Sequence, residues 1–370
     1  MYIMKRFIVI IITALCVVSM YAQTDQSVEY KYVDATKLTV VGKVFNDTPQ
    51  PFHRLDTKKF KGFNEKEAKL MTYASGIAIA FQSDSPSISI IPKYGEIRLS
   101  PATAVMSTRG FDLYIKDTEG KYGAPGRWIY AEAHPGRPDK PATIKDCLDT
   151  SMKEFLLYLP TYSEVLGLQI GVEKGYKIKE IPNPFRHRIA IFGSSFTHGA
   201  STSRSGMTYP AQLSRMTGLQ FLSLGCSGNC KLQQHFAVAL AAADVDAMVF
   251  DAFSNPSAGM IRECLFPFIE TIQKSHPDIP LIFQQTIYRE TRNFNASKDA
   301  SEAEKMETAK AMMDEAMKKY KNVYFIVPNA ASEAHDTSVD GTHPGDYGYW
   351  IWAESVRDQI VEILAKYGIQ

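Results

Sequence analysis

From residue 185 onward, strand-like and helix-like segments alternate along the chain. Short runs rich in branched and aromatic residues predict five strands, at residues 188–192, 220–224, 247–250, 280–284 and 323–327. Segments with helical periodicity lie between and after them, at residues 209–216, 232–242, 260–274, 301–320 and 347–367. Such alternation is typical of right-handed βαβ units, which build a parallel sheet with helices on both faces. We therefore predict a three-layer α/β/α domain with a five-stranded parallel sheet over residues 185–370.

Residues 23–182 show a different pattern, in which short alternating segments are separated by turn signals. Strands are expected at residues 38–44, 87–92, 110–115, 128–131, 154–160 and 166–172, and a short helix within residues 63–72. Many short strands with almost no long helix predict an all-β sandwich domain. Pro182 and Pro184 then fix an extended backbone path, so we place the domain boundary there.

The first 22 residues predict an export signal. Lys5 and Arg6 precede an apolar run at residues 7–20 that is too short to span a bilayer comfortably, and Ala22 offers a small residue for cleavage. No later run is long enough for a membrane helix, so we expect an exported periplasmic or extracellular protein without stable membrane insertion. The formal net charge is +1 and no basic stripe is visible, which argues against nucleic acid as a partner.

Four cysteines follow the predicted signal: Cys147, Cys226, Cys230 and Cys264. An oxidising compartment permits disulfides, and Cys226 and Cys230 are close enough in sequence for a local bridge. A domain of this size does not need one, and the cysteines have no partners at metal-ligand spacing. Free or structural cysteines are therefore the favoured interpretation.

Polar residues follow the predicted strands at the points where the strands end. The first strand leads into Ser195, the second into a turn with Gly228, and the third into a segment with Asn255. A loop after the last strand carries Asp340 and His343. Because the carboxyl ends of parallel strands lie at one edge of a sheet, we expect these five residues to meet there.

These residue types suit nucleophilic catalysis. A serine hydroxyl needs a base to take its proton, and histidine titrates near neutrality and can act as that base. The histidine needs a carboxylate on its other ring nitrogen, and Asp340 lies three residues before His343. The oxyanion that forms needs fixed donors, for which the candidates are the backbone amides of Ser195 and Gly228 and the side chain of Asn255.

These residues resemble the four motif blocks of the SGNH (GDSL-type) serine hydrolase superfamily. The resemblance assigns Ser195 as nucleophile, Gly228 and Asn255 to the oxyanion hole, and Asp340 with His343 to the catalytic pair. The sequence Gly-Phe-Asp-Leu-Tyr at residues 110–114 is similar to the GxDLY signature of an exported bacterial branch with an amino-terminal β domain. The resemblance implies ester hydrolysis without a metal or cofactor. In one departure, Ser194 stands where the name-giving Gly-Asp-Ser has its aspartate.

We therefore expect an exported serine esterase that removes a short acyl group, chiefly acetyl, from a carbohydrate through an acyl-enzyme. Two alternatives stay open: a lipolytic or general short-chain esterase, and a glycan-binding protein that has lost catalysis. Thr197 stands where Gly-x-Ser-x-Gly would have its second glycine, which argues against an α/β-hydrolase. The sequence predicts neither the natural substrate nor the oligomeric state.

Several other residues allow two interpretations. His198 is expected to line the pocket or cap the segment after Ser195 rather than to catalyse. Arg289 and its neighbours Tyr288 and Arg292 could contact substrate or belong to a solvated loop. The aromatic residues of the first half are expected to fill the sandwich core or the domain contact, with a sugar-binding platform as the alternative; they are Tyr114, Trp128, Tyr130 and Tyr162.

Overall fold

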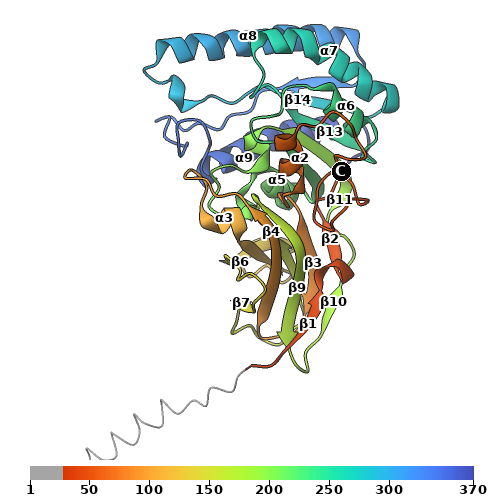
Figure 1. Cartoon of the computed structure of the whole chain (residues 1–370), viewed down its shortest axis with the longest axis vertical. Helices are drawn as coiled ribbons and strands as arrows, with labels where there is room; N and C mark the ends of the chain where they lie inside the picture. Colours follow the sequence, from red (N-terminus) through yellow and green to blue (C-terminus); the bar gives the residue numbers. More distant parts are fainter. Residues whose placement is uncertain (1–27) are drawn as a thin grey trace, which may run out of the picture.

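The structure is a computed structural model that describes residues 28–370, so the predicted export signal lies outside the described residues. Its second half contains the predicted five-stranded parallel sheet, in the order β12-β11-β13-β14-β15. Strands β11, β13 and β14 of this sheet are labelled in Figure 1. The strands are β11 (Arg186–Gly193), β12 (Leu219–Gly225), β13 (Ala247–Asp251), β14 (Leu281–Gln284) and β15 (Val323–Ile326). Every neighbouring pair in this sheet is parallel, which confirms the predicted α/β fold.

Helices cover both faces of this sheet because its strands are apolar on both sides. Along β11, Ile189 and Ile191 pack with Trp352 on one face, whereas Ala190 and Phe192 pack into the core on the other. The first face is covered by α5 (Tyr209–Thr217) and α9 (Asp346–Ala365). The second is covered by α6 (Gln234–Ala241), α7 (Ala258–Ser275) and α8 (Ala296–Lys319). Within residues 28–370, no helix combines the length and apolar character that crossing a membrane would require.

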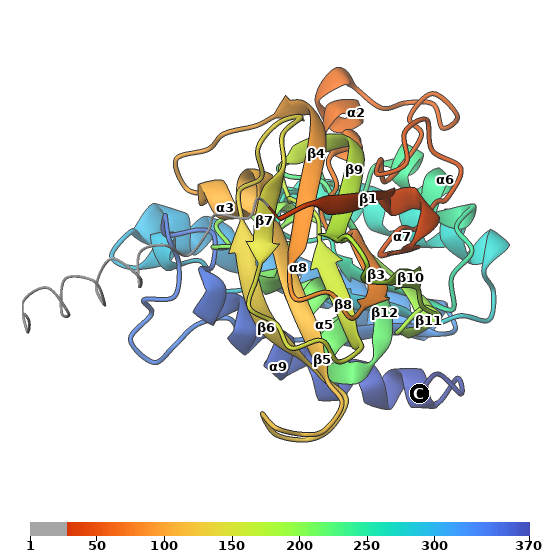
Figure 2. The same ribbon diagram turned by 90° about the horizontal axis from the view of Figure 1, so that it is seen from below.

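The first half consists of two antiparallel sheets, as expected for a sandwich (Figure 2). One sheet contains β1 (Tyr30–Asp34), β9 (Ser163–Glu173), β4 (Ile88–Ile97) and β7 (Ala142–Lys145). The other contains β10 (Ile178–Glu180), β3 (Ala78–Ser83), β8 (Lys153–Tyr158), β5 (Phe111–Asp117) and β6 (Arg127–His134), and β2 (Thr39–Val41) pairs with β3. Phe81 and Phe155 of the second sheet and Ile90 and Ile170 of the first share one buried cluster. The sequence patterns did not predict β1, β3, β7 or β10.

Short helices complete the fold. They are η1 (Ala35–Lys37), α2 (Glu65–Thr72), α3 (Val105–Arg109), α4 (Ser195–His198), η2 (Ser205–Met207) and η3 (Glu290–Arg292). Helix α2, which falls within the predicted segment 63–72, begins with a reciprocal capping box between Asn64 and Glu67.

The Gly-x-Asp-Leu-Tyr segment of the first half holds a loop of the second half. Asp112 is buried and accepts hydrogen bonds from the Arg204 guanidinium at 2.8 Å and from the Gly206 amide at 2.7 Å. Arg204 also donates to the Tyr114 hydroxyl at 2.6 Å. A Cβ on Gly206 would lie 2.6 Å from Asp112 and Tyr114, so only glycine fits this contact. Tyr114 therefore belongs to the contact between the halves, as one of the two sequence interpretations expected.

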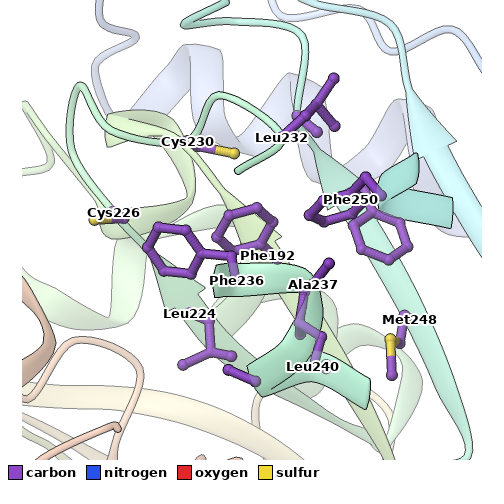
Figure 3. Close-up of a cluster of buried hydrophobic side chains, with 14 of the residues drawn as sticks. Phe192, Leu224, Cys226, Cys230, Leu232, Phe236, Ala237, Leu240, Met248 and Phe250 are labelled. Carbon is purple, nitrogen blue, oxygen red and sulfur yellow. The ribbon is translucent and has the colours of Figure 1, made fainter. Parts of the chain in front are cut away.

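The cysteines of the second half are free thiols. Cys226 and Cys230 are both buried and lie in the same hydrophobic cluster as Phe192 and Phe236, with their sulfur atoms well separated (Figure 3). The local disulfide that the sequence left open is therefore not formed. Burial raises the pKa of the Cys226 thiol to about 12, so this thiol is protonated and unreactive at neutral pH.

Candidate active site

The nucleophile candidate lies on the sharp turn between β11 and α4. Ser194 caps the helix by accepting a hydrogen bond from the Phe196 amide at 3.1 Å, which makes Ser195 the first helical residue. Backbone amides in a first helical turn have no partner within the helix, so the Ser195 amide is available to the site. A Cβ on Gly193 would lie 2.0 Å from the Thr197 hydroxyl, so the turn requires glycine.

Ser195, His343 and Asp340 form a continuous chain of hydrogen bonds. Ser195 Oγ lies 2.8 Å from His343 Nε2, and His343 Nδ1 lies 2.8 Å from Asp340 Oδ2. Asp340 Oδ1 accepts the backbone amides of His343 at 2.7 Å and Thr342 at 3.0 Å. Partial burial raises the pKa of Asp340, but these hydrogen bonds outweigh it and hold the pKa below its ordinary value. Asp340 is therefore a carboxylate at neutral pH.

The loop that carries this pair is braced by a turn that the sequence did not single out. Glu290 accepts the backbone amides of Thr337 at 2.7 Å and Ser338 at 2.9 Å, and the Thr291 amide donates to Gly341 O at 2.7 Å. These bonds fix the backbone on the amino-terminal side of His343.

Gly228 and Asn255, the other two oxyanion candidates, line the same cavity as Ser195 and His343. This cavity measures about 360 Å³ and is lined by residues that include Gly228 and Asn255. Gly228 follows β12 and has φ of +71°, a conformation that favours glycine. Asn255 follows β13, and its Oδ1 accepts the Cys230 amide at 3.3 Å. Within residues 28–370, the Asn255 amide nitrogen has no hydrogen-bond partner, so it is available as a donor in the cavity.

A buried carboxylate on the neighbouring strand β13, that of Asp251, holds the turn before Ser195. Asp251 Oδ2 accepts the amide of Ser194 at 3.0 Å, its hydroxyl at 2.7 Å and the Thr197 hydroxyl at 3.1 Å, while Oδ1 accepts the Ser254 hydroxyl at 2.8 Å. Burial raises the pKa of Asp251, although the hydrogen bonds from Ser194 and Ser254 oppose the shift. Asp251 thus joins the turn before Ser195 to the segment before Asn255.

We expect the Asp251→Ala variant to lose about 3–5 kcal/mol of unfolding free energy, because four buried donors lose their acceptor. Asp251→Asn keeps one acceptor oxygen and should lose less than half as much. Urea unfolding followed by circular dichroism measures both. If Asp251→Ala unfolds at the wild-type urea concentration, the carboxylate does not hold these segments together.

The first half anchors the turn that carries Gly228. The Arg54 guanidinium is fully buried and donates to Gly225 O at 2.9 Å, Tyr73 O at 2.8 Å and Leu70 O at 2.6 Å. Burial lowers the pKa of Arg54 to about 10, which still leaves it charged at neutral pH. The Tyr162 hydroxyl lies 2.6 Å from Ser227 Oγ. Groups of the first half therefore bond to the Gly225 backbone and to the Ser227 side chain, on either side of Cys226.

The remaining sequence candidates have mixed outcomes. His198 neither lines the cavity nor faces Ser195: it is buried, stacks on Tyr162 with centroids 4.2 Å apart, and lies 2.8 Å from Thr161 O. Arg289 lines the cavity, whereas Tyr288 and Arg292 border a separate hollow of about 700 Å³.

The four aromatic residues do not form one platform. Tyr114 and Tyr162 are buried, whereas Tyr130 is 46% exposed and Trp128 is half-buried. Tyr162 lines the cavity, and Tyr130 stacks on the Arg204 guanidinium at 3.9 Å. Tyr114 and Tyr162 are thus buried, as expected for residues of the core or of the domain contact. Tyr162 also lines the cavity.

Comparison with known proteins places this chain among the SGNH-type esterases. The GDSL-like lipase/acylhydrolase family matches residues 186–361, and the GxDLY family, described as the N-terminus of Esterase_SGNH_hydro-type, matches residues 30–178. A solved structure described as a GDSL-like lipase from Bacteroides ovatus is 36% identical, with a TM-score of 0.86, and the match covers 91% of this chain and 98% of that one. The chain therefore belongs to the GDSL-like lipase/acylhydrolase family.

More distant structures share the fold. A salicylyl-acyltransferase from a tetracycline biosynthetic pathway is 19% identical, with a TM-score of 0.67 and coverage of 92% of this chain and 99% of that one. A family two carbohydrate esterase from Cellvibrio japonicus is 10% identical, with a TM-score of 0.55 and coverage of 91% and 98%. A comparison with curated proteins gives no match.

Proposed function

We propose that this protein is an exported serine esterase that removes acetyl or a similarly short acyl group from a carbohydrate. The observation that carries the proposal is the hydrogen-bonded chain from Ser195 through His343 to Asp340 beside the donors of Gly228 and Asn255. We further propose that the chain divides at residues 182–185 into a β-sandwich domain and a hydrolase domain. The two family matches, which lie on either side of this segment, support that division.

The proposed mechanism assigns one task to each group. Ser195 Oγ attacks the ester carbonyl while His343 Nε2 takes its proton, and Asp340 stabilises the imidazolium. The amides of Ser195 and Gly228 and the Asn255 amide nitrogen stabilise the oxyanion. His343 then gives the proton to the departing alcohol, which leaves an acyl group on Ser195. Water, deprotonated by His343, cleaves this acyl-enzyme and restores the serine.

The lining of the cavity favours a short acyl group. Its volume of about 360 Å³ is at the small end of the range for ligand sites. Within the part of the chain that the structure describes, the only apolar aliphatic side chains that line it are those of Ala102 and Ala200. The aromatic ones are those of Phe196 and Tyr162. A long acyl chain would need a larger apolar wall. The carbohydrate esterases that share the fold support a sugar as the alcohol part of the ester.

The oxyanion assignment leads to a prediction for Asn255. We expect Asn255→Ala to lower kcat for an acetyl ester about 10²- to 10³-fold, because one transition-state donor is lost, while KM changes little. Steady-state kinetics with 4-nitrophenyl acetate measure the change. A loss in KM alone would assign Asn255 to substrate binding and not to the oxyanion hole.

Two measurements test the proposed function. Rapid acid quench during turnover of 4-nitrophenyl acetate, followed by peptide mass spectrometry, should find one acetyl group on the peptide that contains Ser195. Among 4-nitrophenyl esters of increasing acyl length, the acetyl ester should have the highest kcat/KM. Acetylated xylosides should be hydrolysed with a higher kcat/KM than acetyl esters of simple alcohols. Preference for long acyl chains would support the lipolytic alternative. Absence of hydrolysis and acylation, with retained sugar binding, would support the glycan-binding one.

A further inference from the structure

Two cations from the first half line the cavity around Ser195. Lys66 lies on α2, and Arg98 lies in the loop after β4. Within residues 28–370, neither forms an ion pair, although several neighbouring lysines do, such as Lys69 with Glu96 at 2.5 Å. The third cation of the cavity, Arg289, differs because it is paired with Glu302 at 3.2 Å.

The acidic groups nearby are already engaged. Glu67, next to Lys66, is buried and bonds to the Asn64 amide at 3.1 Å, with His235 also 3.1 Å away. Glu96, close to Arg98, pairs with Lys69. Among the described residues, Asp340 is the one carboxylate that lines the cavity, and it is engaged with His343. The charges of Lys66 and Arg98 are therefore not neutralised by the described residues, and this side of the cavity is positive.

Both cations lie next to the turn that carries Gly228. Lys66 Nζ is 3.9 Å from the point where a Cβ on Gly228 would lie. The Arg98 guanidinium lies over the Tyr162 ring at 5.8 Å, and the Arg98 amide donates to Tyr162 O at 2.9 Å. The Tyr162 hydroxyl in turn bonds to Ser227, so Arg98 is held on the cavity wall beside the oxyanion candidates.

We propose that these cations select an ester whose sugar carries an anionic group, chiefly the carboxylate of a uronic acid. This inference rests on the proposed function, because it names the substrate class of that same site. A small acetyl group leaves no place for a charge, so the anion belongs to the alcohol part of the ester. Guanidinium and ammonium groups bind carboxylates by charge-assisted hydrogen bonds, and a recess with one sign of charge concentrates oppositely charged substrates.

The test compares acetylated sugars that differ in the group at carbon 6. The substrates are a methyl glucuronoside with one acetyl ester, the corresponding carboxamide, and an acetylated methyl glucoside 6-sulfate. We expect wild-type kcat/KM to be roughly tenfold or more higher for the carboxylate than for the carboxamide. Added NaCl should reduce this ratio, because the two cations are exposed to solvent. The sulfate substrate shows whether any anion is accepted or the planar carboxylate is preferred.

The Lys66→Gln/Arg98→Gln double variant should reduce the carboxylate-to-carboxamide ratio to roughly one. A matched control, Lys37→Gln/Lys61→Gln, removes two exposed, unpaired lysines of the first half that do not line the cavity, and should keep the wild-type ratio. A wild-type ratio near one overturns the inference, and so does a ratio that survives in the double variant. Ser195-dependent hydrolysis of 4-nitrophenyl acetate in the same preparations shows that the proposed esterase function stands independently of that result.

Discussion

Replacing Ser195 with alanine should lower kcat for 4-nitrophenyl acetate by about 10⁴- to 10⁶-fold. Alanine has no hydroxyl to attack the carbonyl or to become acylated. The oxyanion donors and His343 remain in place in this variant. Water at the site could then still attack the ester slowly, so kcat is not expected to fall to zero.

The Ser195→Ala variant should fold like the wild type. In the wild type, the half-buried Ser195 hydroxyl bonds only to His343 among the described residues, so its loss removes no contact within the core. The cap of the helix is made by Ser194 and remains. Steady-state rates and thermal unfolding of the two proteins measure both expectations. Ser301→Ala makes the same change at an exposed position of α8 and serves as the control, because it should keep the wild-type rate and stability. Equal rates in wild type and Ser195→Ala would refute the proposed esterase mechanism.

The fold of the second half could be predicted because its strands and helices differ sharply in hydrophobic pattern. A parallel strand covered on both faces reads as an unbroken apolar run, as in β11 and β13. The observed bounds differ from the expected ones by one or two residues at most of the strand ends.

Strand β3 of the first half shows why local patterns missed part of the sandwich. Ile79 and Phe81 face the sandwich core, whereas Ala78 and Ala80 face a second buried cluster that includes Ala211 of α5. Both faces are therefore buried, and the polar–apolar alternation that marks a half-exposed strand is absent. The short strands β7 and β10, of four and three residues, offer too few positions for a pattern to be recognised.

The five candidate site residues could be named from sequence because each follows a strand end or lies in one motif. The residues that hold them carry no comparable signal. Asp251 accepts a hydrogen bond from Ser194, which lies 57 positions earlier in the chain. Arg54 donates one to the carbonyl of Gly225, 171 positions later. An aspartate at the end of the strand beside the nucleophile strand was the available signal for Asp251. Nothing local distinguishes Arg54 from a surface arginine, because its burial arises only when the two halves pack.

The second large effect is expected for Asp340→Asn. This substitution should lower kcat for an acetyl ester by about 10⁴-fold with little change in KM. The reason is the geometry around the carboxylate. Oδ1 accepts two backbone amides, so the carbonyl oxygen of asparagine would remain there and its NH₂ group would face His343 Nδ1. That NH₂ group can only donate, so Nδ1 must accept and the ring proton moves to Nε2.

A protonated Nε2 cannot take the proton of Ser195, so the imidazole would be held in the wrong tautomer for catalysis. Asp336→Asn makes the same change on an exposed aspartate that bonds to Ser332, and should leave kcat within about twofold of wild type, as is usual for a surface site. Kinetics at several pH values above 5 should find the deficit throughout, because Asp340 is a carboxylate there. A deficit below tenfold would mean that His343 keeps its productive tautomer without Asp340, and that the carboxylate contributes mainly to the shape of the loop.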